Sequence, residues 1–168
     1  MATHICGESV SENFREIYQL EQAKDYPGII RAMVSDGGRI RKQYGPDLNH
    51  AWYVVGDAYY CLDEFKKALK AFRRAMFYDN SDAFALMAIA NCYSSLERPQ
   101  MSAIYLRRAL GIKPNDAALH YNLANALFDA GKYEAAIEEY SIVVRGKSSV
   151  AKKARTNRRL ALALSGKV

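Results

Sequence analysis

The chain has 168 residues, of which half are hydrophobic and a quarter are charged, and its formal net charge is +6. This composition is typical of a folded domain and excludes a disordered or collagen-like chain. No apolar run approaches the ~20 residues of a membrane-spanning helix, and the N-terminus lacks the basic start and apolar stretch of a secretion signal. We therefore expect a cytoplasmic protein without membrane insertion.

The positive charge is concentrated near the C-terminus. Residues 145–168 carry eight basic side chains and no acidic one, whereas the other 144 residues hold 16 basic and 18 acidic side chains. Three interpretations remain open for this basic segment: a solvated polar end, an electrostatic rim that attracts an acidic partner, and nucleic-acid binding. Its basic residues are spread around the expected helix, which is unfavourable for nucleic-acid binding.

The first expected element is an imperfect helix pair over residues 10–48. Tyr26 aligns there with Phe65, Pro99 and Tyr133, each at the start of a second helix. The separation between Tyr26 and Phe65 places five extra residues between positions 35 and 50. We expect a long loop or an extended helix in that stretch.

Three units with a period of 34 follow, over residues 49–82, 83–116 and 117–150. Large residues return to large positions and small residues to small positions. The aligned residues are Trp52, Val55, Gly56, Tyr59, Ala68, Phe72 and Ala75; then Leu86, Ile89, Ala90, Tyr93, Ser102, Leu106 and Ala109; then His120, Leu123, Ala124, Leu127, Ala136, Tyr140 and Val143. Each unit reads as two amphipathic helices, and a glycine inside the first helix indicates close approach of the second.

Local signals mark the ends of these helices. Asp82, Asp116 and Ser149 stand where N-cap residues stand, and Pro99 suits the first turn of a helix. Gly131 suits a left-handed turn between the helices of its pair. Residues 151–168 either form a terminal helix that caps the array, or the chain is a segment of a longer protein.

The spacings Trp52-x2-Val55-Gly56-x2-Tyr59 and Ala68-x3-Phe72, with Pro114 near the end of a unit, resemble the tetratricopeptide repeat. The resemblance implies an all-α, right-handed superhelical solenoid of antiparallel helix pairs, in one domain over residues 1–168. It has three clear repeats, one degenerate N-terminal repeat and a C-terminal helix. The third repeat departs from the pattern at His120 and Leu127.

A solenoid of this kind exposes a curved inner surface, built mainly from the first helix of each pair. Rotating by one residue from the packing positions predicts which side chains line a partner-binding groove. They are His50, Tyr53, Asp57 and Tyr60; Phe84, Met87 and Asn91; Tyr121, Asn122, Asn125 and Phe128; and Lys152, Arg155 and Arg159 from the terminal helix. The aromatic residues could instead pack against neighbouring helices.

Asparagine amides both donate and accept hydrogen bonds, so they can hold the backbone of an extended peptide. The resemblance implies such a role for Asn91, Asn122 and Asn125, which match the places of peptide-holding asparagines in the family. Tyr53 and Met87 occupy the position where the family's two-carboxylate clamp has lysine. Binding of an acidic C-terminus in that mode is therefore not expected.

The sequence indicates no enzyme, no cofactor and no metal site. His120 reads as a satisfied core histidine, Cys61 and Cys92 as small buried residues, and His4 with Cys6 offers only two metal ligands. We expect a non-catalytic scaffold, adaptor or chaperone-like module that binds a protein or peptide partner. The alternatives are an interaction module of a larger complex or enzyme and a nucleic-acid-associated factor, and a homo-oligomer stays open.

Overall fold

The structure is a computed structural model that describes residues 14–146 and 148–166. Within these ranges the chain is helical, and its only β-type pairing is an isolated bridge. The α-helices are α1 (Arg15–Gln22), α2 (Tyr26–Met33), α3 (Leu48–Cys61), α4 (Phe65–Tyr78), α5 (Ala83–Ser95), α6 (Pro99–Ile112), α7 (Ala117–Asp129), α8 (Tyr133–Val143) and α9 (Ser149–Leu164). Among the described helices, none is both long and apolar enough to cross a membrane.

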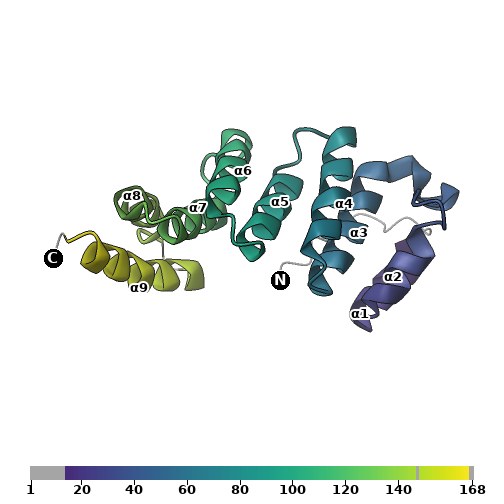
Figure 1. Ribbon diagram of the computed structural model, residues 1–168, viewed down its shortest axis with the longest axis horizontal. Coiled ribbons are helices and arrows are strands. Elements are labelled where there is room, and N and C mark those ends of the chain that lie inside the picture. Colours follow the sequence, from purple (N-terminus) through teal and green to yellow (C-terminus); the bar gives the residue numbers. More distant parts are fainter. Residues whose placement is uncertain (1–13, 147, 167–168) are drawn as a thin grey trace.

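The helices form a one-dimensional stack. Each helix from α1 to α8 packs against the next along the chain, including α2 against α3, although a longer connection joins those two helices. Figure 1 shows the stack running from α1 and α2 at one end to α9 at the other. The predicted all-α solenoid of helix pairs is confirmed, with the pairs α1–α2, α3–α4, α5–α6 and α7–α8.

The turn within each pair repeats the same backbone conformation. Lys24, Asp63, Glu97 and Gly131 have positive φ angles of 56°, 58°, 56° and 73°. The last three are each 34 residues apart, so the period of the sequence is also a period of the backbone. Gly131 adopts the predicted left-handed turn, whereas the equivalent turns place a side chain in a conformation that costs ~1–2 kcal/mol. Packing of the paired helices must offset that cost.

Helix starts follow the predicted capping chemistry with one correction. The Asp82 carboxylate accepts hydrogen bonds from the backbone N–H groups that open α5, and the Asp116 carboxylate does so for α7. Pro99 occupies the first turn of α6. The prediction for Ser149 was wrong: the side chain of Ser148 caps α9, and Ser149 is already helical. The terminal helix therefore starts two residues before the predicted position 151, because the cap lies closer to α8.

The extra residues before α3 form a loop rather than an extended helix. Val34 and Ile40 pair as an antiparallel bridge, and the 3-10 helix η2 (Lys42–Asp47) follows. Tyr44 of η2 is fully buried, with its ring 5.2 Å from that of Phe14. We call residues 34–47 the insertion loop, which Tyr44 anchors to the core.

His120 links α7 to α8. Its Nδ1 lies 2.7 Å from a carboxylate oxygen of Glu139, and its Nε2 lies 2.9 Å from the carbonyl oxygen of Pro114. Both ring nitrogens therefore have partners, as predicted for a satisfied packing residue. The ring is half-buried at the edge of the repeat and does not belong to the innermost core.

Candidate functional site

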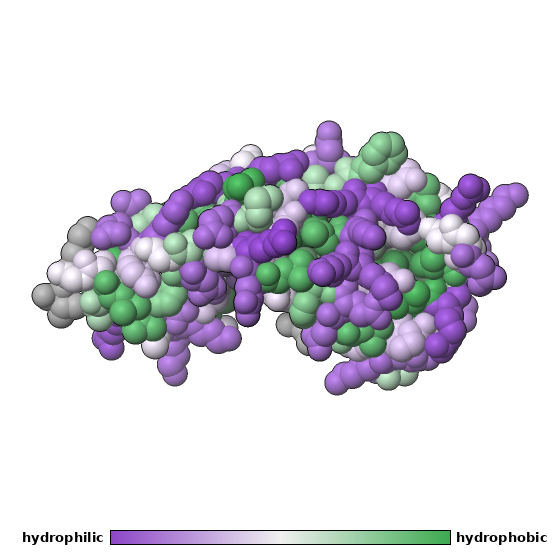
Figure 2. Space-filling model, viewed as in Figure 1, coloured by the Kyte–Doolittle hydropathy of each residue, from purple (hydrophilic) through white to green (hydrophobic). Residues whose placement is uncertain are grey.

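The predicted groove residues of α3, α5 and α7 lie at equivalent positions of successive first helices. Within α3 and α5 they are spaced by three or four residues and so lie on one face, and in α7 Asn122 is adjacent to Tyr121 in sequence, which broadens the face by about 100°. One hydrogen bond joins α3 to α5 beside this face: the Tyr60 and Ser95 hydroxyl groups lie 3.1 Å apart. We call this surface the inner stripe, and its members are His50, Tyr53, Asp57, Tyr60, Phe84, Met87, Asn91, Tyr121, Asn122, Asn125 and Phe128. In Figure 2 the lower outline of the molecule is hollowed between the α9 end and the α1–α4 end.

Most of the inner stripe is half-buried rather than open. Apart from His50 and Asp57, which are exposed, its members are partly covered by their neighbours. Met87, Tyr121 and Phe128 pack against the edge of the core formed by α5 to α9. Phe84 lies under the ammonium group of Lys113, whose Nζ is 3.7 Å from the ring centroid. The stripe is therefore a shallow surface with apolar side chains at its floor.

The α3 end of the stripe is acidic and partly desolvated. Asp57 and Glu21 of α1 both keep exposed surface, but the protein atoms around their carboxylates displace part of the surrounding water. This partial desolvation raises the pKa of Asp57, and desolvation followed by the charge of Asp57 raises the pKa of Glu21. The Tyr53 ring centroid lies 5.3 Å from that of Phe72, and burial raises the pKa of Tyr53 to about 12. A cationic side chain placed here would relieve the repulsion between Asp57 and Glu21.

Aromatic pairs close the edge of two repeats. Tyr60 meets Phe65 edge-to-face at 5.3 Å between ring centroids, and Phe128 meets Tyr133 in the same way at 5.4 Å. The equivalent residues of the middle repeat are Ser94 and Pro99, which carry no aromatic ring. The middle repeat is therefore left open where its neighbours are filled.

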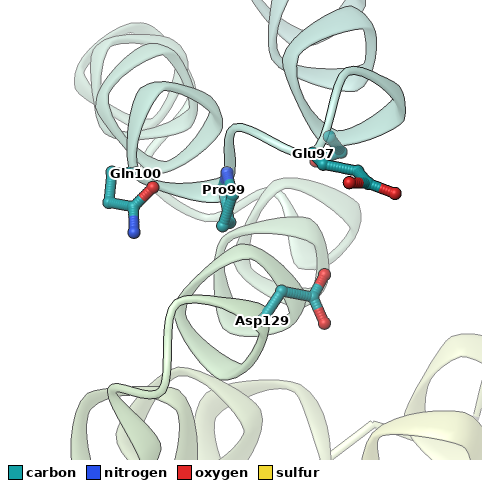
Figure 3. Close-up of a pocket in the computed structure, with 5 residues that line it drawn as sticks. Glu97, Pro99, Gln100 and Asp129 are labelled. Carbon is teal, nitrogen blue, oxygen red and sulfur yellow. The ribbon is translucent and has the colours of Figure 1, made fainter.

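A cavity of about 410 Å³ occupies that opening. Its lining residues are Ser94, Glu97, Pro99, Gln100 and Asp129. In Figure 3 Glu97, from the α5–α6 turn, and Asp129, from the end of α7, lie on one side of Pro99, and Gln100 lies on the other. Burial raises the pKa of Asp129. Two carboxylates beside a roomy opening suit a basic or hydrogen-bonding side chain of a partner.

The groove predicted from the sequence does not include Glu97, Pro99, Gln100 or Asp129. The available signal was the loss of an aromatic residue at both equivalent positions, 94 and 99, in one repeat. Each loss is unremarkable alone, because serine and proline are common at helix ends. The cavity follows only when the two positions are known to face each other.

The three asparagines of the stripe differ in their hydrogen bonding. The Asn125 carbonyl oxygen accepts from the Tyr140 hydroxyl at 2.6 Å and from Asn157 of α9 at 3.2 Å. Within the described residues, the Asn91 and Asn122 side chains form no hydrogen bond, although both are half-buried. Asn125 therefore takes part in the internal packing of the fold, whereas the amides of Asn91 and Asn122 have no hydrogen-bond partner among the described residues.

The terminal helix turns a different face toward the stripe than the one predicted. Asn157 also donates to the Tyr121 hydroxyl at 3.2 Å, so its side of α9 faces α7. Lys152, Arg155 and Arg159 project ~140–200° away from it. Arg155 donates to the carbonyl oxygens of Val144 and Gly146 in the α8–α9 connection. These three basic residues do not join the inner stripe.

The histidines and cysteines are the candidate residues for metal binding or catalysis. No group of three or more metal-ligating side chains occurs among these residues. His4 and Cys6 lie outside them. Cys92 is buried as predicted and Cys61 is half-buried, and burial raises the pKa of both thiols.

Comparisons with known proteins agree with this architecture. Residues 85–116 and 104–145 match tetratricopeptide repeat families. No curated protein matches the chain in sequence. Among solved structures, YrrB, described as a protein of this repeat class "with an unusual peptide-binding site", has a TM-score of 0.67 at 19% identity and covers 92% of this chain and 73% of its own.

Two further structures contain ligands. PcrH, solved "in complex with the chaperone binding region of PopD", has a TM-score of 0.66 at 16% identity and covers 71% of this chain and 95% of its own. The first repeat domain of Spaghetti (RPAP3), solved "bound to HSP90 peptide SRMEEVD", has a TM-score of 0.64 at 17% identity and covers 69% of this chain and 94% of its own.

The stacked pairs and their inner stripe define an all-α solenoid repeat protein. The 34-residue period and the sequence matches over residues 85–145 identify tetratricopeptide repeats in this chain, and the structural likenesses show the same fold. Tetratricopeptide repeats typically form a non-catalytic protein-interaction fold.

Proposed function

We propose that this protein is a non-catalytic scaffold or chaperone-like adaptor that binds an extended segment of a partner protein along its inner stripe. The observation that carries the proposal is the pair Asn91 and Asn122, whose half-buried amides have no partner within the described residues. Tyr53, Met87 and Tyr121 flank them with apolar surface. The structures of PcrH and of the Spaghetti domain support it, because each was solved with a bound segment of another protein.

Binding would combine three elements of the stripe. The Asn91 and Asn122 amides would donate to and accept from the backbone of the guest segment, independently of its sequence. The cavity beside Ser94 and Asp129 would accept one side chain, and the acidic end at Asp57 would favour a basic residue. Affinity for a lone peptide should be about micromolar, because the segment must be ordered on binding.

The other sequence-based alternatives stay predictions. Membership of a larger complex or enzyme is compatible with the same surface. Nucleic-acid binding through the C-terminal segment has less support, because Arg155 is engaged with backbone carbonyl groups. Its signature would be a steep salt dependence that disappears when residues 151–168 are removed. A cytoplasmic location likewise remains a prediction.

Peptide selection followed by titration tests the groove proposal. A displayed library of random peptides is selected on the intact protein, and the recovered peptides are titrated by fluorescence anisotropy. Asn91→Ala and Asn122→Ala together should weaken binding about tenfold or more, because each removes two backbone hydrogen bonds to the guest. Asn125→Ala is unsuitable for this purpose, since it also removes internal bonds.

The matched control is Arg107→Ala on α6, an exposed residue outside the stripe. It should leave affinity unchanged, and circular dichroism should show the same helical content in every variant. Filling the cavity with Ser94→Phe should weaken only those peptides that carry a basic residue. Peptides that bind the asparagine double variant as tightly as the parent protein would reject the groove.

A further inference from the structure

A second cavity lies on the insertion loop, apart from the inner stripe. Its volume is about 360 Å³, and it shares no lining residue with the stripe. Its walls come from the insertion loop, the start of α3 and the end of α4. The lining residues are Gly38, Arg39, Ile40, Leu48, Trp52, Arg74, Phe77 and Tyr78.

Arg74 links the insertion loop to α3 and α4 at this cavity. Its guanidinium donates to the carbonyl oxygen of Gly38 at 3.0 Å, and its Cζ lies 4.4 Å from the ring centroid of Trp52. Tyr44 anchors the other end of the insertion loop in the core. The loop is therefore fixed against α4 as a wall, so the cavity exists before any ligand arrives.

The rim of the cavity exposes aromatic side chains that do not contribute to packing between the helices. Phe77 is 83% exposed and Tyr78 is 50% exposed, and their rings meet edge-to-face at 5.3 Å. The residue equivalent to Phe77 in the next repeat is Gly111. Since that repeat packs with no side chain at this position, helix stacking does not explain an aromatic residue here. Large exposed apolar side chains gathered around a cavity are typical of binding surfaces.

The cavity is lined by two cations and no anion. Arg39 and Arg74 are exposed, and neither forms an ion pair within the described residues. Of the nearby aspartates, Asp47 caps α3 and Asp79 accepts two hydrogen bonds from Ser81. Asp36 of the insertion loop forms no ion pair with either arginine among the described residues and does not line the cavity. The positive charge of the two arginines is therefore not neutralised within the cavity.

We propose that this cavity is a second docking site, which binds an acidic segment of a partner protein. The segment places one aromatic or branched aliphatic side chain against Phe77 and Tyr78 at the rim, beside the stacked Arg74 and Trp52, and its carboxylates pair with Arg39 and Arg74. Arginine beside aromatic rings suits this combination, because the guanidinium binds carboxylates in a fork while the rings take the apolar side chain. The site is independent of the inner stripe, so the protein can hold one partner at two points or two partners at once.

Fluorescence anisotropy with designed peptides tests this site. The probe is a labelled peptide with a central phenylalanine flanked on both sides by glutamate and aspartate. One comparison peptide replaces the acids by their amides, and another replaces the phenylalanine by glycine. The acidic phenylalanine peptide should bind the full chain, and both comparison peptides should bind about tenfold more weakly.

Two variants and two controls locate the binding. Phe77→Ala and Arg39→Ala should each weaken the acidic peptide about tenfold. Both side chains are exposed, so thermal unfolding should be unchanged. Ile112→Ala and Arg107→Ala, which remove an exposed apolar and an exposed basic side chain from α6, should have no effect. The Asn91 and Asn122 double variant should bind this peptide normally, which separates a failure here from a failure of the groove.

Several outcomes would overturn the proposal. Equal binding of the acidic and amide peptides would remove the role of the arginines, and unchanged binding by Phe77→Ala would place the peptide elsewhere. Binding of phosphatidylserine vesicles or of single-stranded RNA that Arg39→Ala abolishes, without binding of the acidic peptide, would assign the site to a membrane or to nucleic acid. Self-association that Phe77→Ala abolishes, without peptide binding, would assign it to a second copy.

Discussion

Gly56 of α3 lies directly against the ring of Phe72 of α4. A β-carbon added to Gly56 would stand 2.6 Å from both Cδ1 and Cε1 of that ring, which is closer than side-chain carbons approach. Phe72 is fully buried and also packs against the following pair through Ile89 and Tyr93. The absence of a side chain at position 56 therefore lets α3 and α4 approach closely. It also leaves the space that the Phe72 ring fills between the second and third helix pairs.

Gly56→Ala should destabilise the protein by ~1–3 kcal/mol. The substitution gains helix propensity of about 1 kcal/mol, but the methyl group forces the buried Phe72 ring to move. Urea unfolding followed by circular dichroism measures the difference. Gly111→Ala in α6 is the control: a β-carbon there meets nothing within 4 Å, so this variant should be stabilised by up to ~1 kcal/mol. Stabilisation of both variants would contradict the close approach.

Asn157→Ala should loosen the terminal helix. Its amide donates to Tyr121 and Asn125 across the α7–α9 contact, and the loss of two part-buried hydrogen bonds should cost ~1–2 kcal/mol. Hydrogen exchange should then quicken in α9 before the other helices. Asn122→Ala removes an amide without a described partner and should change stability by less than ~0.5 kcal/mol. Equal losses in the two variants would contradict the docking of α9 through Asn157.

Asp57→Asn should make the protein more stable at neutral pH. The pKa of Asp57 is raised from its ordinary 3.8 by burial, so the folded state binds this proton more tightly than the unfolded chain. The desolvation of the charged Asp57 carboxylate lowers the free energy of unfolding at neutral pH, and this loss disappears as the pH falls through the raised pKa. The asparagine variant should therefore gain less stability on acidification than the parent. It should also lower the pKa of Glu21, which the charge of Asp57 helps to raise and which an NMR titration can follow.

The two described cysteines should differ in reactivity. Cys92 is fully buried, and burial raises its pKa to about 12, whereas Cys61 is half-buried with a smaller increase. Since the thiolate is the reactive form, iodoacetamide should label Cys61 slowly and Cys92 only when the protein unfolds. Peptide mapping by mass spectrometry measures both rates. Rapid labelling of Cys92 in the folded protein would contradict its burial between the second and third helix pairs.

The repeat pattern of the sequence by itself determines where the helices lie. Its period, the caps at Asp82 and Asp116, and the glycine at position 131 depend on interactions within a few residues, which local sequence specifies directly. Gly56 likewise predicted that α3 and α4 approach closely. Ser149 was misjudged as a cap because Ser148 carries the same hydroxyl, and local sequence does not decide between neighbouring serines.

The tertiary structure decided which side chains of each exposed face stay accessible. Helical periodicity places Asn91, Asn122 and Asn125 on the same face of their helices. Of these three, only Asn125 is hydrogen-bonded by α9, because the rotation of α9 against α7 brings Asn157 to it. The same rotation turns Lys152, Arg155 and Arg159 away from the stripe. The cavities beside Ser94 and Phe77 arise where separate segments meet, at distances along the chain that no local pattern encodes.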